Sequence, residues 1–223
     1  PNLPSADTPE GESEADNTVL RTVGEPPQFS FTPKEHWELG PHFGMDTERA
    51  AVVSGSRFTY LFGDLALLEF ALVQHAFSTL TDPDILDGIR TRAQLDVPAT
   101  PFIPAVPPVL IKPEVFDRMA RLEPREERYH IPNDDLFLIG SAEHTLGPLH
   151  MDETVPEHRL PIRYAGFSSS FRREAGSHGK DVRGMLRVHQ FDKVELESFS
   201  LPEHSLHEQE FFVAIQEYLL QSL

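Results

Sequence analysis

Cysteine is absent from this sequence of 223 residues. The absence excludes a disulfide scaffold and a zinc site built on thiolates. Histidines remain as candidate metal ligands: His144, His150, His158 and His178. Their spacing matches neither a helical ligand pair nor a Cys/His finger, so we expect no protein-held metal site. A chain without cysteine also fits a cytoplasmic protein.

Positive charge is scarce. The chain has 19 Lys and Arg against 36 Asp and Glu, which gives a formal net charge of -17. A general polyanion-binding surface is therefore excluded, because phosphate neutralisation needs clustered Lys and Arg. Any contact with nucleic acid must be local, or must depend on a part outside this sequence.

Long apolar runs are missing too. None approaches the ~20 residues that a membrane-spanning helix needs, so we expect no membrane partner. Residues 1–17 are acidic and rich in proline, and they lack the basic and apolar regions of a secretion signal. No Met stands at position 1, so we do not expect Pro1 to be a native start.

The patterns that are present predict a linker followed by one mixed domain. Residues 1–28 read as a linker because Pro, Glu, Asp and Ser dominate them. The domain would then span residues 29–223. Within it, residues 46–62 predict a short helix and then a strand from Arg57. Residues 82–100 carry Asp, Gly, Pro and Thr and predict a surface insertion.

The domain combines helices with a sheet. The spacing of Leu65, Leu68 and Leu72 gives residues 65–80 the apolar stripe of an amphipathic helix, and the prolines of residues 102–111 enforce an extended segment. Strands are expected at 136–139, 160–174 and 185–199. Ser205 to Glu208 matches a capping box before a helix whose apolar stripe predicts core packing. We expect an α+β fold, an antiparallel sheet flanked by helices.

The two longest strands carry the candidate chemistry. Successive side chains of a strand alternate between its faces. Arg187, His189, Phe191, Lys193 and Glu195 therefore share one face of the second strand, opposite an apolar face. In the first strand, Ser168, Ser170, Arg172 and Glu174 share a face.

Such a polar face suits a nucleotide together with an amino acid. Guanidinium groups bind phosphate or carboxylate bidentately. A phenyl ring stacks on a purine, and a carboxylate accepts hydrogen bonds from an amine or a hydroxyl. The alternation alone leaves a second interpretation open, a solvated sheet face with cross-strand salt bridges.

The order of the residues favours the binding site. Residues 171–195 resemble motif 2 of class II aminoacyl-tRNA synthetases in its seryl form, above all in the runs Glu174-Ala-Gly-Ser177 and Arg187-Val-His-Gln-Phe-Asp-Lys-Val-Glu195. The helix from Leu65 and the segment Val106–Leu110 resemble motif 1, the dimer interface of such enzymes. Ser141-Ala-Glu143 resembles the serine-recognition loop of the seryl branch.

The resemblance implies a serine–tRNA ligase, which joins serine and ATP into seryl-adenylate and passes the seryl group to the 3′ end of tRNA(Ser). It implies an ATP site of Arg172, Glu174, Arg187 and Phe191, with Arg172 on the α-phosphate, Arg187 on the phosphates, Glu174 on the adenine amino group and Phe191 stacked on the ring. Arg172 and Arg187 would be catalytic, with Mg²⁺.

The serine site implied by the resemblance consists of Ser141, Glu143, Arg172 and Glu195. Arg172 would hold the serine carboxylate, and the two glutamates, helped by Ser141, would contact the hydroxyl and the amine. The implied partners are serine, ATP, a second copy of the chain and tRNA(Ser), the last mainly through a coiled-coil arm expected before residue 1. Motif 3 would follow residue 223, so we expect this sequence to be an incomplete part of the enzyme.

Two other functions stay open at this point. A synthetase-like ligase could load an amino acid onto a carrier protein, and a non-catalytic remnant could serve only to dimerise. Gly176, Gly179 and Gly184 lack the order of a P-loop, so we expect them at a hairpin tip rather than around a phosphate.

Overall fold

The structure, a computed structural model, describes residues 8–174 and 183–223 and divides the chain into two units, residues 1–35 and 36–223. The first unit holds one 3-10 turn, Glu14–Asp16. The Asp16 carboxylate accepts hydrogen bonds from the backbone N–H groups of Glu12 and Ser13 at 2.9 and 3.0 Å. Most of its described residues are exposed.

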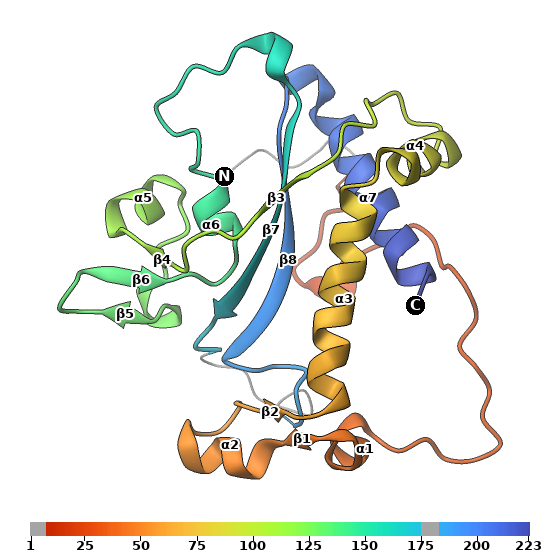
Figure 1. The fold of residues 1–223 in the computed structure, drawn as a ribbon, viewed down its shortest axis with the longest axis vertical. Helices are drawn as coiled ribbons and strands as arrows, with labels where there is room; N and C mark the ends of the chain where they lie inside the picture. The colour runs from red at the N-terminus through yellow and green to blue at the C-terminus, as the bar shows by residue number, and fades with distance from the viewer. Residues whose placement is uncertain (1–7, 175–182) are drawn as a thin grey trace. The chain divides into compact units, whose positions relative to one another are not determined.

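The second unit contains the sheets and helices (Figure 1). Its helices are α1 (His36–Phe43), α2 (Thr47–Val53), α3 (Asp64–Leu80), α4 (Pro83–Arg92), α5 (Pro113–Arg118), α6 (Glu143–Leu146) and α7 (Ser205–Gln221). Its strands are β1 (Met45–Asp46), β2 (Tyr60–Leu61), β3 (Ile103–Ala105), β4 (Leu110–Ile111), β5 (His130–Ile131), β6 (Leu136–Leu138), β7 (Ile162–Phe171) and β8 (Gln190–Phe199). Short 3-10 turns lie at Arg125–Glu127, Glu157–Arg159 and Pro202–His204.

The strands form three small sheets. The long hairpin of β7 and β8 is antiparallel, and β3 joins β7 in parallel, so the order is β3–β7–β8. A second sheet has the order β4–β6–β5, and β1 pairs with β2. The α+β expectation is confirmed, with β3 as a parallel addition to the antiparallel hairpin.

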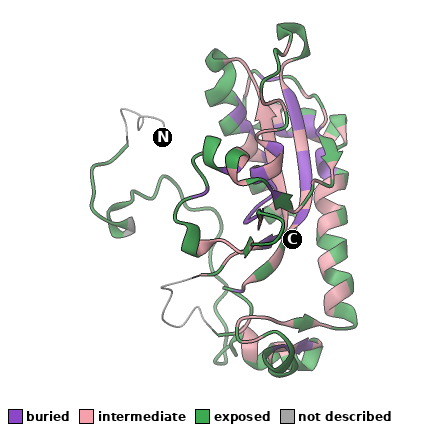
Figure 2. Cartoon of the chain, turned by 90° about the vertical axis from the view of Figure 1, so that its left-hand side faces the viewer, coloured by how far each residue is buried: buried purple, intermediate pink, exposed green. Residues whose placement is uncertain are grey.

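The main core lies on the apolar face of the hairpin. Ala165 of β7 packs with Leu86 of α4, Phe211 and Ile215 of α7, and Leu80 at the end of α3. Buried residues gather along the long strands (Figure 2). The expected core packing of the last helix is therefore confirmed. A smaller core joins β4, α5 and β6 through Ile111, Phe116 and Phe137.

Residues 82–100 are not a surface insertion. Asp82 caps α4 by accepting the N–H groups of Asp84 and Ile85, and Pro83 fits the first helical turn. Leu86 and Ile89 of α4 are buried in the main core, as is Val97. The polar composition belongs to the exposed face of an amphipathic helix, which the sequence interpretation mistook for a surface insertion.

Three further expectations need correction. The second long strand begins at Gln190 rather than at 185, so Arg187 lies in the preceding loop. The strand expected from Arg57 comprises only Tyr60–Leu61, because Arg57 has a φ of 63°. Glu208 does not close a capping box: α7 has no side-chain cap, and the Glu208 carboxylate instead pairs with Arg163.

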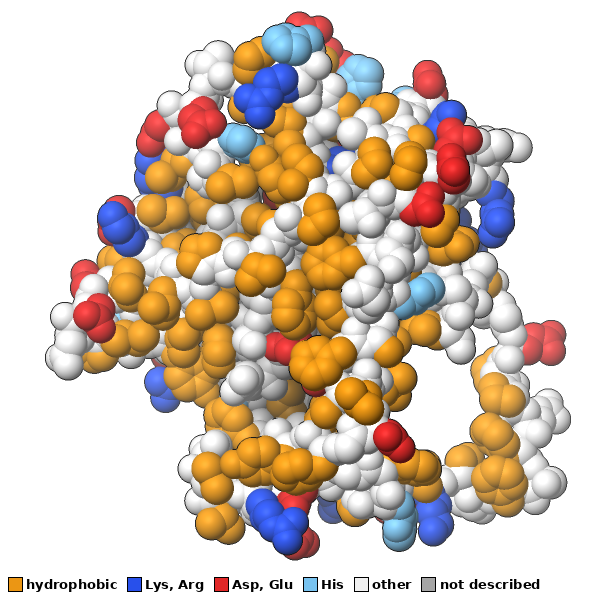
Figure 3. Space-filling view, in the orientation of Figure 1, with side chains coloured by type: hydrophobic (Ala, Val, Ile, Leu, Met, Phe, Trp, Pro, Cys, Tyr) orange, Lys and Arg blue, Asp and Glu red, His pale blue; other side chains and the backbone are white. Residues whose placement is uncertain are grey.

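Helix α3 confirms the expected helix but leaves most of its apolar stripe uncovered. Leu68 is 53% exposed and Leu72 is 42% exposed, whereas Leu80 is buried. Hydrophobic side chains appear on the face of the molecule that α3 presents in Figure 3. No helix of the described residues has both the length and the apolar character needed to cross a membrane.

Candidate functional site

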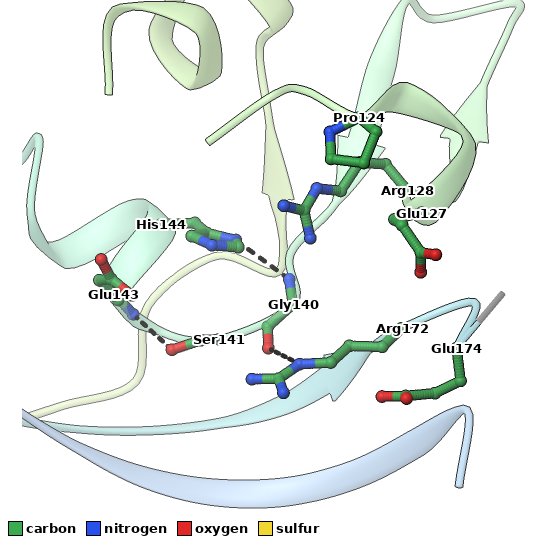
Figure 4. Close-up of a pocket in the computed structure, with 9 residues that line it drawn as sticks. All are labelled: Pro124, Glu127, Arg128, Gly140, Ser141, Glu143, His144, Arg172 and Glu174. Carbon is green, nitrogen blue, oxygen red and sulfur yellow. Dashed lines mark hydrogen bonds between the residues drawn. The ribbon is translucent and has the colours of Figure 1, made fainter. Parts of the chain in front are cut away.

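A pocket of about 290 Å³ opens beside the end of strand β7. It is lined by Pro124, Glu127, Arg128, Gly140, Ser141, Glu143, His144, Arg172 and Glu174 (Figure 4). These residues come from the loop before β5, from the turn between β6 and α6, from α6, and from the end of β7. Four of the residues expected at a site thus line one pocket: Ser141, Glu143, Arg172 and Glu174.

Arg172 enters the pocket directly after β7. Its backbone N–H donates to the His189 carbonyl at 2.9 Å, which keeps the two chain segments paired beyond the last strand residues. Its Nε donates to the Gly140 carbonyl at 3.1 Å. Its guanidinium carbon lies 5.2 Å from the centre of the Phe191 ring, a cation–π distance. The side chain is therefore fixed in the pocket by a carbonyl and a ring.

Glu174 and Arg187 meet at the mouth of the hairpin. The Arg187 Nε lies 3.7 Å from Glu174 Oε2. Glu174 has a φ of 50°, in the left-handed region that a glutamate seldom adopts. Arg187 approaches Glu174 from a loop rather than from a strand. The two side chains are close, as expected, but the strand alternation from which we expected this does not apply to Arg187. Residues 175–177 of the matched run, with Gly176 and Gly179, lie outside the described residues.

Three of the four expected serine-binding residues, Ser141, Glu143 and Glu195, form a hydrogen-bonded cluster. Ser141 is buried, its hydroxyl donates to the Glu195 carboxylate, and it accepts the Glu143 N–H at 3.1 Å. Glu195 Oε2 also lies 2.6 Å from Lys193 Nζ, and Glu143 Oε1 accepts from Arg121 at 3.0 Å. Each of the two carboxylates therefore has a cation beside it, Arg121 for Glu143 and Lys193 for Glu195.

Two pocket residues, Arg128 and His144, and one residue that pairs with a pocket residue, Arg121, were missed by the sequence interpretation. Burial lowers the pKa of Arg128 first, and the nearby Arg172 guanidinium lowers it further. Arg121 neutralises Glu143 from the same loop region. His144 was weighed only as a metal ligand. The clustering of arginines within Arg121 to Arg128 was the signal that could have indicated an anion-binding wall.

His144 is held neutral in this pocket. Its Nδ1 accepts the Gly140 N–H at 3.1 Å, so the ring proton lies on Nε2. Burial, followed by the positive charges of Arg128, Arg121 and Arg172, lowers its pKa to about 4. Its ring packs against Phe116 with centroids 4.6 Å apart. The imidazole therefore acts as an acceptor rather than as a charge.

Glu197 is a third carboxylate behind the serine-binding cluster. It follows Glu195 by two residues and thus shares its face of β8. Burial, followed by the negative charges of Glu143 and Glu195, raises its pKa to about 7. Near neutral pH this carboxyl is therefore partly protonated.

No three His, Asp or Glu side chains in the described part of the chain are grouped in a way that could hold a metal ion. His150 contacts Glu153 at 2.9 Å and Tyr164 at 3.1 Å. His178 lies outside the described residues. These contacts give His150 a hydrogen-bonding role beside a second hollow of about 630 Å³ near Ser198–Ser200.

Comparison with known proteins finds a family similar to this part of the chain. Residues 126–223, which include the pocket and the long hairpin, match the model of the tRNA synthetase class II core domain (G, H, P, S and T). The match is a similarity to this family over those residues. The pocket-lining Arg172 and Glu174, and the hairpin that carries them, lie within the matched residues.

Relatives extend the similarity over the whole chain. The chain is 46% identical over 201 residues to a serine–tRNA ligase of Acidothermus cellulolyticus, covering 89% of this chain and 44% of that protein. It is 42% identical over 225 residues to a serine–tRNA ligase of Fervidobacterium nodosum, covering 100% of this chain and 49% of that protein. The chain thus spans about half the length of the curated relatives it matches.

A solved structure agrees with the class II core. The seryl-tRNA synthetase of Pyrococcus horikoshii, complexed with ATP, superposes with a TM-score of 0.87 at 33% identity, over 100% of this chain and 51% of that one. The serine–tRNA ligase of Naegleria fowleri, in complex with AMP, gives a TM-score of 0.82 at 27% identity, over 98% of this chain and 49% of that one. The expected resemblance to the seryl branch is confirmed.

Proposed function

We propose that this chain supplies the serine- and ATP-binding part of a serine–tRNA ligase. One observation carries the proposal: the guanidinium of Arg172 shares a pocket with the buried Ser141 hydroxyl, which is bonded to Glu195. The first group suits an anion and the second suits a hydroxyl. ATP and AMP in the similar enzymes of known structure support a nucleotide as the anion's source.

In the proposed first step, a serine carboxylate oxygen attacks the α-phosphorus of ATP. The new C–O–P linkage forms seryl-adenylate, and the bond to the β-phosphate oxygen breaks to release pyrophosphate. Serine is already a carboxylate at neutral pH, so the step needs no general base. The chain's task is to position the two reactants and to stabilise the charge on phosphorus.

Residue roles follow from the contacts. Arg172, fixed by Gly140 and Phe191, would bind the α-phosphate and the serine carboxylate. Arg187, beside Glu174, would contact the outer phosphates. Glu174 would accept from the adenine amino group, and Phe191 would lie against the adenine ring.

The serine side chain would enter the hydrogen-bonded cluster. Ser141 and Glu195 would share its hydroxyl, while Glu143 would bind the ammonium group. Arg121 and Lys193 already pair with these carboxylates in the structure. Serine binding would then replace part of an existing ion pair rather than neutralise a bare charge.

Mg²⁺ belongs to the proposal as a partner of ATP. The pocket offers the carboxylate of Glu127, and Mg²⁺ is commonly held by one or two carboxylates together with substrate phosphates. When bound, the ion would draw charge away from the phosphate oxygens. Transfer to tRNA(Ser), with its 3′ hydroxyl attacking the seryl carbonyl and AMP leaving, completes the reaction.

A homodimer and a cytoplasmic location are further parts of the proposal. The exposed apolar stripe of α3, with Leu68 and Leu72, lies on the segment that resembles motif 1 and could pack on its own copy. The lack of cysteine suits the cytoplasm. Loading of a carrier protein remains the second candidate, because the pocket activates serine in the same way for either acceptor.

Serine-dependent exchange of pyrophosphate into ATP tests the proposal. The full protein that contains these residues should catalyse exchange with serine and not with alanine. Transfer is then measured with tRNA(Ser) and with a carrier protein as acceptors. Exchange without tRNA charging would favour the carrier-protein function, and no exchange with any amino acid would contradict both.

A further inference from the structure

Arg57 lies far from the pocket in sequence but adjoins it in the fold. It stands between α2 and β2, 117 residues before Glu174, and does not line the pocket. Nevertheless its Nη1 donates to the Glu174 carbonyl at 2.9 Å in a partly buried setting. The contact joins the segment before α3 to the two long strands where the hairpin opens.

Residues 57 and 58 also contact His189, which directly precedes the second strand of the hairpin. The Arg57 carbonyl accepts the His189 N–H at 3.0 Å. The ring of the next residue, Phe58, lies 5.3 Å from the His189 ring. Arg57 therefore contacts both sides of the open end of the hairpin, Glu174 on the first side and His189 on the second, and Phe58 contacts His189 as well.

His189 is in turn hydrogen-bonded to the backbone of Arg172. Its Nδ1 lies 2.9 Å from the Arg172 carbonyl, which can only accept, so the ring nitrogen donates. The His189 carbonyl in turn accepts the Arg172 N–H. A chain of hydrogen bonds thus runs from the Arg57 carbonyl through His189 to Arg172. A separate hydrogen bond joins the Arg57 side chain to the Glu174 carbonyl.

The backbone shows why a brace is needed at this place. Glu174 has a φ of 50° and Arg57 a φ of 63°, both in the left-handed region that strains an L-residue with a side chain. Such conformations persist only where the surroundings over-determine them. At Glu174 the conformation turns the carboxylate toward the pocket, as Figure 4 shows.

We propose that Arg57 is a positioning residue for the nucleotide: by holding the Glu174 carbonyl and the His189 N–H, it fixes the left-handed turn that aims Glu174 at the base. The inference rests on the proposed function, since it assigns the base of ATP to Glu174. Arg57 touches no reacting atom in this account. Ser141 and Glu195 lie outside this chain of hydrogen bonds, and the Arg172 guanidinium is held separately by the Gly140 carbonyl and the Phe191 ring. Serine binding should therefore depend on Arg57 less than ATP binding does.

The test compares Arg57→Met and Arg57→Lys with Arg49→Met in the full protein. Methionine keeps the length and apolar stem of the side chain but removes the donor, whereas lysine restores one. Arg49 is the matched control, because it is an exposed arginine on α2 that pairs only locally with Asp46. The KM values for ATP and for serine are measured separately in the pyrophosphate exchange assay.

We expect Arg57→Met to raise the KM for ATP about tenfold or more, because small displacements of a positioned group have large effects. The KM for serine should change less than about twofold, and Arg57→Lys should recover part of the loss. The preference for ATP over inosine triphosphate, which has oxygen in place of the amino group, should shrink in Arg57→Met. A merely structural role would leave this preference unchanged.

Direct titration with ATP distinguishes the two ways of failing. Wild-type protein that binds ATP, together with Arg57→Met that binds it equally well and keeps the base preference, would overturn the role of Arg57 and leave the proposed function standing. Wild-type protein that binds no ATP would overturn the proposed function itself. If Arg57→Met does not fold, Arg57→Gln decides, because its side chain is shorter than that of arginine and lacks the guanidinium; an unchanged base preference and KM would then count against the inference.

Discussion

Arg163 and Arg172 stand nine residues apart along one strand and its extension, and the contrast between them separates structure from function. Arg163 is buried; it donates to Glu208 at 2.6 and 2.8 Å and to the carbonyls of Pro98 and Thr100. The guanidinium of Arg172 donates to one carbonyl, that of Gly140, within the described residues. Both guanidinium groups lie over phenyl rings.

The difference lies in how many acceptors the protein itself supplies. Arg163 has a carboxylate in bidentate contact and two carbonyls, so its donors are used within the core. Arg172 faces a pocket in which Arg128 is a second cation. A guanidinium placed beside another cation is suited to an anion that the protein does not supply.

Breaking the buried pair should give the largest effect. Glu208→Ala leaves the Arg163 charge buried with no carboxylate, and we expect the free energy of unfolding to fall by about 3–5 kcal/mol. Denaturant unfolding measures it. The control is Arg118→Met, which breaks the exposed pair with Asp152 and should cost less than about 1 kcal/mol. Similar losses of the free energy of unfolding in both variants would contradict the structural role given to the buried pair.

Protonation of His144 should be the next largest effect. Its pKa is lowered from 6.5 to about 4 in the folded protein, so the unfolded chain binds more protons between these values. Stability is therefore full above pH 6.5 and falls as the pH drops toward 4, by roughly 3 kcal/mol in total for this group.

Glu197 shifts stability in the opposite direction. Its pKa is raised from 4.5 to about 7, so its contribution is full below pH 4.5 and is lost as the pH rises toward 7. The two slopes oppose each other between 4.5 and 6.5. We expect His144→Asn, which keeps an acceptor for the Gly140 N–H, to gain about 2 kcal/mol relative to wild type on going from pH 7.5 to 5. Equal pH profiles would show that His144 is not held neutral.

Arg172→Ala should lower activity and leave stability nearly unchanged, whereas Glu208→Ala should lower stability. Removing a charge-stabilising donor lowers the rate of serine-dependent exchange by about 10²-fold or more. The free energy of unfolding should change by less than about 1 kcal/mol, because the side chain is only partly buried. Exchange at the wild-type rate would remove Arg172 from the site.

Glu195→Gln should give the smallest change. The carboxylate accepts from Ser141 and pairs with Lys193, and an amide keeps the size but loses the charge. Sites built around a substrate hydroxyl reject the analogue that lacks it by roughly 10⁴-fold. We expect the preference for serine over alanine to shrink at least about tenfold in the exchange assay. An intact preference would make Glu195 a partner of Lys193 alone.

The sequence was informative where residue order was specific. The run from Arg187 to Glu195 indicated the family, and residues 171–174 and 141–143 placed four members of one pocket. The apolar face of the hairpin was predicted from alternation, because Val194 and Leu196 do pack on the main core. Such local patterns are set by the strand repeat and need no tertiary information.

Tertiary pairing explains what the sequence did not show. Arg163 and Glu208 are 45 residues apart and meet only when α7 packs on β7, so Glu208 looked like a local cap. The polar face of α4 concealed Leu86 and Ile89, which become core residues only against α7. Arg57 reaches Glu174 across 117 residues, and no spacing rule connects them.

The most direct measurement is the affinity of the full protein for a non-hydrolysable seryl-adenylate analogue, with the alanyl analogue as its control. The first ligand places a phosphate-like group at Arg172 and a hydroxyl at Ser141 and Glu195 in one molecule. The account predicts that the seryl analogue binds at least about 100-fold more tightly, and that Arg172→Ala weakens both analogues. Equal affinity for the two analogues, or no binding of either, would contradict it.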